Sequence, residues 1–235
     1  METVKGIILD YGGTIDTNSR HWAEVLWEQY VAQGIPVEKS AFREAYVYGE
    51  RTLAKEKHIY PEDDFRRVLY VKTALQFDYL ISKGFLPVDS KGAEDVAERS
   101  YAYVLRVLEK TRPVLEKLAA HYPLVLVSNF YGNIHTILED FGLSTYFSDI
   151  VESSIVGLRK PDPAIYALGV ERMGLPAQNI LVIGDSFSKD VVPAKAVGCQ
   201  AVWLQGEGWG GEEIDPALPD YTISDLTEIL MLLHL

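Results

Sequence analysis

Short apolar runs recur along the chain, at residues 4–9, 124–127, 180–183, 201–204 and 221–223. Runs of this length that are apolar at nearly every position are typical of strands in a parallel sheet covered on both faces. In the second half of the chain, positions such as Ile134, Ile137 and Phe141 recur at helical spacing between the runs. Strands that alternate with helices predict an α/β fold built on a doubly wound parallel sheet.

The stretch from residue 18 to residue 110 differs, because it contains no convincing strand. Its apolar faces recur at helical spacing in three places. They are formed by Trp22, Leu26 and Tyr30, by Phe65, Leu69, Lys72 and Leu75, and by residues 93–108. A helical block directly after the first strand is a second domain that interrupts the first. We therefore expect a core of residues 1–17 and 111–235 and an inserted α-helical domain of residues 18–110.

The composition and net charge of the chain limit the kinds of molecule that it is expected to bind. The chain has 235 residues, of which 48% are hydrophobic and 24% charged, as in ordinary globular proteins. Its net charge of −12 argues against nucleic acid or an anionic membrane as the main partner. A small phosphorylated substrate remains compatible, because a local metal ion or lysine sets the field inside a cleft.

Cysteine usage and the N-terminal residues bear on localisation. The one cysteine, Cys199, excludes a disulfide within the chain and fits a reducing compartment. The first residues lead into an apolar run without the features of a signal peptide, and no apolar run approaches the length of a membrane span. We expect a cytoplasmic protein, monomeric or homodimeric, that does not bind membranes.

The most informative motif follows the first apolar run, where Asp10 is followed by Gly12, Gly13 and Thr14. An apolar strand that ends on an acid places charge at the carboxyl edge of a parallel sheet, where α/β proteins bind ligands. A strand-end acid that caps a turn is the ordinary alternative. The first motif therefore gains its weight from three further motifs.

These three motifs follow in the order that one enzyme architecture requires. They are Ser128 and Asn129 after the run 124–127, Lys160 in Gly-Leu-Arg-Lys-Pro-Asp-Pro, and Asp185 and Asp190 after the run 180–183. Each alone is common in turns, loops or helix starts. Together with Asp10 they make the full chain resemble the haloacid dehalogenase-like (HAD) hydrolase superfamily, most of whose members are magnesium-dependent phosphohydrolases. The resemblance implies a Rossmann-like core, with the helical block as an α-helical cap.

The resemblance also implies a role for each catalytic residue. Asp10 is the nucleophile that takes up the phosphoryl group as an aspartyl phosphate. Ser128 and Asn129 bind phosphoryl oxygens, where a helix start favours an anion. Lys160 neutralises the charge that Asp10 shares with the phosphoryl group.

Four residues are implied to form a magnesium site. Mg²⁺ prefers oxygen ligands in an octahedron and keeps several waters. By resemblance, Asp10, Asp185 and the backbone carbonyl of Gly12 are ligands, and Asp190 is an outer or alternate ligand. Because the family uses the carbonyl at that position, glycine there removes no ligand.

Gly12 departs from the family pattern. The phosphatases have an Asp there, which protonates the leaving alkoxide and later activates water. Positioned acid–base groups contribute about 10²- to 10⁴-fold in rate. Three possibilities remain open: another acid, such as Asp16 or a cap residue, or a substrate group replaces it; the leaving group needs no proton, as with an acyl phosphate; or turnover is poor.

Two positions outside the motifs are candidates for substrate contact. Arg51 falls where related caps present a substrate-recognition loop, although an exposed surface arginine is the ordinary alternative. Trp209, in a glycine-rich loop, has no obvious core role. The aromatic residues Trp22, Trp27, Tyr46 and Tyr48 are more typical of the cap core than of a substrate site.

The favoured function is Mg²⁺-dependent hydrolysis of a small phosphorylated metabolite. Phosphonate hydrolysis, dehalogenation and phospho-ligand binding with weak turnover are the alternatives. Asp185 argues against a dehalogenase, because those enzymes work without metal and lack this acid. Phosphonate hydrolases form a Schiff base with a cap lysine. The sequence singles out none of the candidate lysines, which are Lys39, Lys55, Lys57, Lys72 and Lys83.

Overall fold

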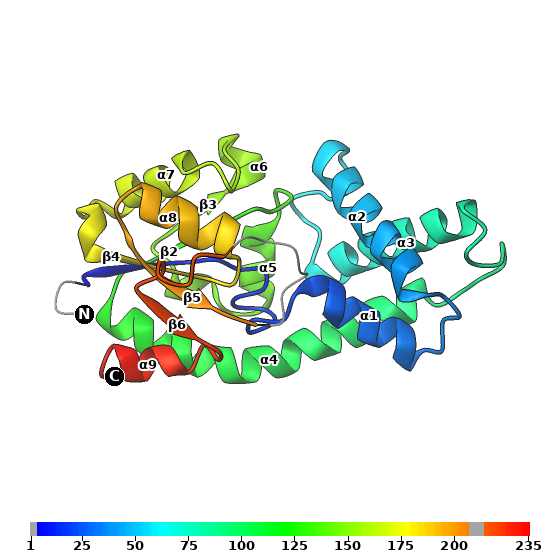
Figure 1. Cartoon of the computed structure of the whole chain (residues 1–235), viewed down its shortest axis with the longest axis horizontal. Helices are drawn as coiled ribbons and strands as arrows, with labels where there is room; N and C mark the ends of the chain where they lie inside the picture. The colour runs from blue at the N-terminus through cyan, green and yellow to red at the C-terminus, as the bar shows by residue number, and fades with distance from the viewer. Residues whose placement is uncertain (1–3, 207–213) are drawn as a thin grey trace.

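A parallel sheet forms the centre of one lobe in the computed structural model, which describes residues 4–206 and 214–235 (Figure 1). Within those residues the sheet has six strands in the order β3-β2-β1-β4-β5-β6, and all neighbours are parallel. The strands are β1 (Gly6–Leu9), β2 (Leu124–Ser128), β3 (Asp149–Glu152), β4 (Ile180–Gly184), β5 (Gln200–Leu204) and β6 (Tyr221–Ile223). The predicted α/β fold with a doubly wound parallel sheet is confirmed.

The strands are apolar at consecutive positions because both faces of the sheet are covered. Along β1, Ile7 and Leu9 belong to one buried cluster and Ile8 belongs to a second. The first cluster includes residues of α4 (Ala93–His121), α5 (Ile134–Asp140) and α9 (Glu228–Leu232), and the second includes residues of α7 (Ala164–Met173) and α8 (Val192–Ala196). Alternate side chains of each strand therefore support opposite layers of helices.

The apolar pattern does not predict strand β3, and the reason lies in its position. β3 is at the edge of the sheet, and only Ile150 and Val151 in it are apolar. Its first two residues are partly exposed. An edge strand that is short and partly exposed needs no continuous apolar run.

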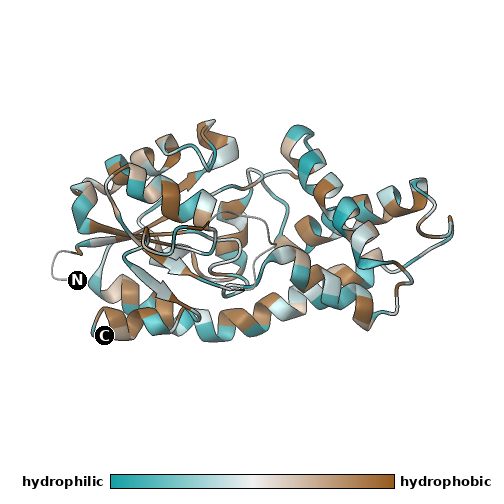
Figure 2. Ribbon diagram, viewed as in Figure 1, coloured by the Kyte–Doolittle hydropathy of each residue, from teal (hydrophilic) through white to brown (hydrophobic). Residues whose placement is uncertain are grey.

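Helices between β1 and β2 form the second lobe, and residues 18–110 contain no strand. They are α1 (Trp22–Ala32), α2 (Lys39–Lys55), α3 (Phe65–Ser82) and the first part of α4. Helix α4 runs beneath both lobes in Figure 1 and alternates between apolar and polar residues in Figure 2. Its early Val104 and late Leu118 are buried in the same cluster. The expected boundary at residue 110 therefore lies inside a continuous helix.

The helices of the structure differ from membrane spans. Across residues 4–206 and 214–235, no helix combines the length and the apolar character that crossing a bilayer requires.

Candidate active site

The carboxyl ends of β1, β2 and β4 meet where the strand order reverses, because β2 and β4 flank β1. Open α/β sheets bind ligands outside this edge. Asp10 directly follows β1, Ser128 ends β2, and Asp185 directly follows β4. A cavity of about 520 Å³ opens there, and its walls include all the predicted core residues: Asp10, Gly12, Ser128, Asn129, Lys160, Asp185 and Asp190.

Lys160 is the buried cation at the centre of the site. Its Nζ lies 2.6 Å from Asp10 Oδ1 and 2.7 Å from Asp190 Oδ1, and only 4% of the residue is exposed. Burial alone would lower the pKa of Lys160, but the two carboxylates outweigh burial and raise it. Lys160 is therefore a fixed positive charge beside Asp10.

Asn129 holds the Lys160 backbone in place. Its Nδ2 donates to the Lys160 carbonyl at 3.1 Å, and its Oδ1 accepts the Lys160 N–H at 2.9 Å. The side chain that the sequence assigns to phosphoryl oxygens is thus engaged with the loop that carries the lysine. Ser128 is 2% exposed and lines the cavity beside it.

Three carboxylates form a cluster that fits a divalent cation. Asp10, Asp185 and Asp190 offer ligand oxygens that lie within 4.8 Å of one another. Burial raises the pKa of Asp10 to about 6, although the charge of Lys160 opposes this rise. Burial, reinforced by the neighbouring carboxylates, raises the pKa of Asp185 well above its usual range. One lysine cannot balance three carboxylates, two of them buried and Asp185 partly buried, and Mg²⁺, which prefers oxygen ligands, would supply the missing charge.

Within this cluster, Asp190 is already hydrogen-bonded through both oxygens. Oδ1 accepts from Lys160 and, at 2.7 Å, from the hydroxyl of Tyr166, while Oδ2 accepts the Ser186 N–H at 3.0 Å. Asp190 lies on a π-helical turn and packs against Gly184 so closely that a Cβ there would overlap it. These contacts favour an outer role for Asp190 and leave direct ligation to Asp10 and Asp185.

The two glycines after Asp10 differ in what they require. Gly13 has φ of +98°, and a Cβ there would overlap the Asp185 carboxylate, so only glycine fits. Gly12 has no positive φ, and a Cβ there would meet no atom within 4 Å. The acid that the family pattern places at Gly12 is therefore absent for no steric reason.

Asp16 is a further buried acid of this cavity. Its Oδ1 accepts the Gly13 N–H at 2.7 Å, its Oδ2 accepts the Trp22 Nε1–H at 2.9 Å, and the residue is 1% exposed. Burial raises the pKa of Asp16 to about 7, although the two hydrogen bonds oppose this rise. A carboxyl group with this pKa exchanges its proton near neutral pH.

The raised pKa of Asp16 makes stability depend on pH. The carboxyl group in the unfolded chain has a pKa of about 3.9, so between about pH 4 and pH 7 the folded protein keeps a proton that the unfolded chain has lost. This contribution to the free energy of unfolding therefore falls as pH rises. An amide does not titrate. Relative to wild type, Asp16→Asn should become more stable by on the order of 3 kcal/mol between about pH 5 and pH 8.

Urea denaturation of both proteins without divalent cations measures this change. The difference between wild type and Asp16→Asn must be used, and not the stability of either protein alone. Burial lowers the pKa of His21 to about 4, and this makes the stability of both proteins rise with pH in the same range. Asp149→Asn is the control. Asp149 is a partly exposed acid on the edge strand β3, and it pairs with Arg172 of helix α7. If the difference in free energy of unfolding between wild type and Asp16→Asn stays constant with pH, the raised pKa of Asp16 is contradicted.

The helical lobe supplies the opposite wall of the cavity. Lys72 on α3 is 8% exposed, and its Nζ lies 2.9 Å from Glu50 on α2. The Tyr131 hydroxyl donates to the same carboxylate at 3.3 Å. Burial alone would lower the pKa of Lys72, but Glu50 and the nearby tyrosines outweigh it and raise the pKa well above its usual range. Lys72 is therefore an ammonium ion.

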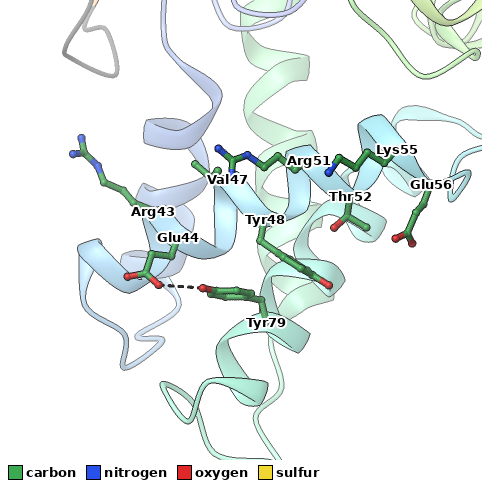
Figure 3. Close-up of a pocket in the computed structure, with 9 residues that line it drawn as sticks. All are labelled: Arg43, Glu44, Val47, Tyr48, Arg51, Thr52, Lys55, Glu56 and Tyr79. Carbon is green, nitrogen blue, oxygen red and sulfur yellow. Dashed lines mark hydrogen bonds between the residues drawn. The ribbon is translucent and has the colours of Figure 1, made fainter.

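Not every candidate for substrate contact reaches the cavity. Arg51 lies on helix α2, where a loop was expected, and lines a separate surface groove of about 670 Å³ beside Tyr48 (Figure 3). Trp22 and Tyr46 are buried, as expected for the core, and also line the active-site cavity, while Trp27 is partly buried against the core. The same expectation is wrong for Tyr48, which is 43% exposed and lines the groove with Arg51. Trp209 lies outside the described residues.

The sequence contained signals for three site residues that received no role. Thr14, in the first motif, donates to Asp10 at 3.3 Å and accepts the Asp185 N–H at 3.1 Å. Tyr166 follows the Lys160 motif within a few residues. Lys72 is a charge within the apolar stripe of α3, and a buried charge requires a partner or a ligand.

Comparison with known proteins identifies the family. A family model described as haloacid dehalogenase-like hydrolase matches residues 4–198. The phosphoglycolate phosphatase of Yersinia pestis is 24% identical over 232 residues, which cover 97% of this chain and 93% of that protein. Alignments with two other curated relatives cover only 43% and 41% of those proteins.

Solved structures share the fold over the full length. A HAD phosphatase from Thermococcus onnurineus is 26% identical, with 98% of each chain covered and a TM-score of 0.55. A dehalogenase is 17% identical, with 99% of this chain and 98% of that chain covered and a TM-score of 0.68. The second likeness shows the fold alone.

Proposed function

We propose that this chain, which belongs to the haloacid dehalogenase-like hydrolases and is a hydrolase, is a Mg²⁺-dependent phosphatase of a small phosphorylated metabolite. The observation that carries the proposal is the cluster of Asp10, Lys160, Asp185 and Asp190 at the carboxyl edge of the sheet, in which only Asp185 is partly exposed. A phosphoryl group needs a nucleophile in line and compensation for its charge, and this cluster offers both.

In this proposal each residue has a stated task. Asp10 attacks the phosphorus atom, forms an aspartyl phosphate and is released when water attacks the same phosphorus. Lys160 holds the Asp10 carboxylate and compensates the negative charge of the phosphoryl oxygens. Ser128 donates a hydrogen bond from its hydroxyl group to one of those oxygens. Mg²⁺, held by Asp10, Asp185 and the Gly12 carbonyl, would supply the remaining positive charge.

The helical lobe is proposed to act as the cap of residues 18–110 over a core of residues 1–17 and 111–235. Its aromatic side chains Trp22 and Tyr46 and the Lys72 ammonium line the cavity opposite Asp10. A cap in this position would exclude water and select the substrate. The likeness to phosphoglycolate phosphatase supports a substrate of similar small size.

Two chemical alternatives are less well supported. Dehalogenation does not explain why the carboxylate of Asp185, which is partly buried, lies close to that of Asp10, where its charge disfavours a metal-free site. Phosphonate hydrolysis through a Schiff base needs a neutral lysine, whereas Lys72 is kept protonated by Glu50. Phosphate-ester hydrolysis requires neither a metal-free site beside Asp185 nor a neutral Lys72.

Magnesium dependence provides the test of this proposal. At neutral pH, millimolar Mg²⁺ should raise the melting temperature of the wild type and be required for hydrolysis of a phosphomonoester panel. Asp185→Asn should weaken Mg²⁺ binding by about tenfold or more, because one of two carboxylate ligands is lost. Calorimetric titration with Mg²⁺ measures the affinity without substrate.

Asp149→Asn is the matched control, because Asp149 does not line the cavity and should leave Mg²⁺ binding unchanged. Metal-independent turnover, or equal Mg²⁺ affinity in wild type and Asp185→Asn, would refute the proposed site.

A further inference from the structure

The missing acid at Gly12 leaves a question about the cavity's other acids. The described acidic side chains that line the cavity are Asp10, Asp16, Glu50, Asp185 and Asp190. Lys160 pairs with two of them and Lys72 with a third, while Asp185 belongs to the carboxylate cluster. Asp16 forms no ion pair with any residue that the structure describes. It is the acid of this cavity without an assigned task.

The turn after β1 brings Asp16 back beside the nucleophile. The N–H groups of Ile15 and Asp16 both donate to the Tyr11 carbonyl, at 2.8 and 3.3 Å, so the backbone makes one full turn after Asp10. Asp16 Oδ1 then accepts the N–H of Gly13. That N–H belongs to the peptide group joining Gly12 to Gly13, so the carboxyl group is anchored to the turn that follows the nucleophile, and Asp10, Gly12 and Asp16 line one cavity.

Two donors orient the Asp16 carboxyl group and leave room for a proton. The Gly13 N–H and the Trp22 Nε1–H each occupy one lone pair of a different oxygen. A carboxyl group has about four such acceptor sites, so one on each oxygen remains for a proton. Because the residue lines the cavity although it is 1% exposed, this proton can be exchanged only with the cavity or with its immediate neighbours.

We propose that Asp16 is the general acid and base of the reaction, supplying from the far end of the turn the proton that Gly12 cannot supply. This inference rests on the proposed phosphatase function. In the first step the bond from Asp10 to phosphorus forms, the bond to the leaving oxygen breaks, and that oxygen takes the Asp16 proton. In the second step water attacks the aspartyl phosphate and returns a proton to Asp16. Phosphate leaves, and both carboxyl groups are restored.

The charges around Asp16 suit this cycle. The titratable and charged groups that interact with it come from four elements: Asp10 and Tyr11 after β1, Asp185 after β4, Lys72 on α3 and Tyr103 on α4. The acids favour the protonated form needed for the first step, and Lys72 favours the carboxylate needed for the second. Both forms are therefore accessible near neutral pH.

The test compares leaving groups. Wild type, Asp16→Asn and Asp16→Ser are assayed with Mg²⁺ on the alkyl phosphate of the panel that wild type hydrolyses fastest, and on p-nitrophenyl phosphate, whose phenolate leaves without a proton. We expect both variants to lose about 10²- to 10⁴-fold in kcat/KM on the alkyl phosphate and about tenfold or less on the phenyl ester. Asp16→Ser keeps an acceptor for the Gly13 N–H, so one variant can be assayed even if the other does not fold.

Two further readouts separate acid catalysis from positioning. The wild-type rate on the alkyl phosphate should fall as pH rises above about 7, and this limb should be absent in Asp16→Asn. Adding Gly12→Asp to Asp16→Asn should recover about tenfold or more, because position 12 has room for a side chain beside the leaving group. In wild type, Gly12→Asp alone should gain little.

The outcomes distinguish this inference from the proposed function. Equal losses of kcat/KM on both esters would overturn the role of Asp16 while leaving the phosphatase function intact. The same holds if the rate of Asp16→Asn still falls above about pH 7 as in wild type. Wild-type hydrolysis of the phenyl ester but of no alkyl phosphate would overturn it too. If wild type hydrolyses no phosphomonoester with Mg²⁺, the proposed function itself fails.

Discussion

Asp10→Asn should reduce phosphomonoester hydrolysis by about 10⁴- to 10⁶-fold, the range seen when the nucleophile of a covalent mechanism is removed. The amide cannot attack phosphorus, so neither step of the proposed cycle can occur. Steady-state assays with Mg²⁺ on p-nitrophenyl phosphate measure the loss. This ester needs no proton on its leaving group, so the assay isolates the nucleophile from any acid catalyst.

The fold of Asp10→Asn should survive. Burial raises the pKa of Asp10 to about 6, so the folded protein carries a cost for ionising this residue at neutral pH that an amide avoids. The amide oxygen of the variant can still accept from Lys160, which also keeps Asp190 as a partner. The melting temperature without Mg²⁺ should therefore stay close to that of wild type.

Asp149→Asn serves as the matched control and should retain activity, because Asp149 lies on the edge strand away from the cavity. Beryllium fluoride should add at Asp10 of the wild type, as an analogue of the aspartyl phosphate, and should not bind covalently to the Asp10→Asn variant. A folded Asp10→Asn protein with wild-type turnover would show that Asp10 is not the nucleophile.

Much of this architecture could be predicted from the sequence because the relevant signals are local. The strands that carry Asp10, Ser128 and Asp185 are buried on both faces, so each is a continuous apolar run that ends on a polar residue. Parallel strands bring these ends to one edge of the sheet, and the three residues meet there without any knowledge of distances.

What the sequence could not supply are the tertiary partners of single side chains. Whether Asn129 faces a phosphoryl group or the Lys160 backbone depends on the path of a loop thirty-one residues later. The resemblance suggests a loop at Arg51, yet this residue is an exposed position of helix α2. The buried positions of α2, among them Phe42, Tyr46 and Leu53, follow helical spacing, so the helix itself was predictable and was missed. Asp16 has no signal of burial in its sequence neighbours, and its surroundings come from the turn and from Trp22.

The second large effect is expected for Lys160→Met, which removes the ammonium while keeping a chain of similar length. Asp10 and Asp190 lose a partner at 2.6 and 2.7 Å, and both are almost completely buried. Removing one partner of a buried ion pair costs about 3–5 kcal/mol in stability. We expect a loss of this size near pH 8 without Mg²⁺, together with a loss of activity of at least about 10³-fold, because the phosphoryl charge is no longer compensated.

The pH dependence of this loss has a definite sign. Without Lys160, the main influence that opposes the effect of burial on the pKa of Asp10 is lost, and this pKa rises above about 6. The folded variant then binds protons more tightly than the unfolded chain, so its stability falls as pH rises through that range. Relative to wild type, Lys160→Met should therefore be less destabilised near pH 5 than near pH 8. Urea denaturation at the two pH values measures the difference.

Lys195→Met is the control for the loss of a lysine charge. Lys195 pairs with Asp220 at the same 2.7 Å, but both side chains are partly exposed, and such surface pairs contribute about 1 kcal/mol or less. Mg²⁺ should restore part of the stability of Lys160→Met, because a divalent cation can take over the compensation of the carboxylates, and should not affect the loss in Lys195→Met. Equal, pH-independent losses in the two variants would mean that the buried carboxylates do not depend on Lys160, and the electrostatic account of the site would be wrong.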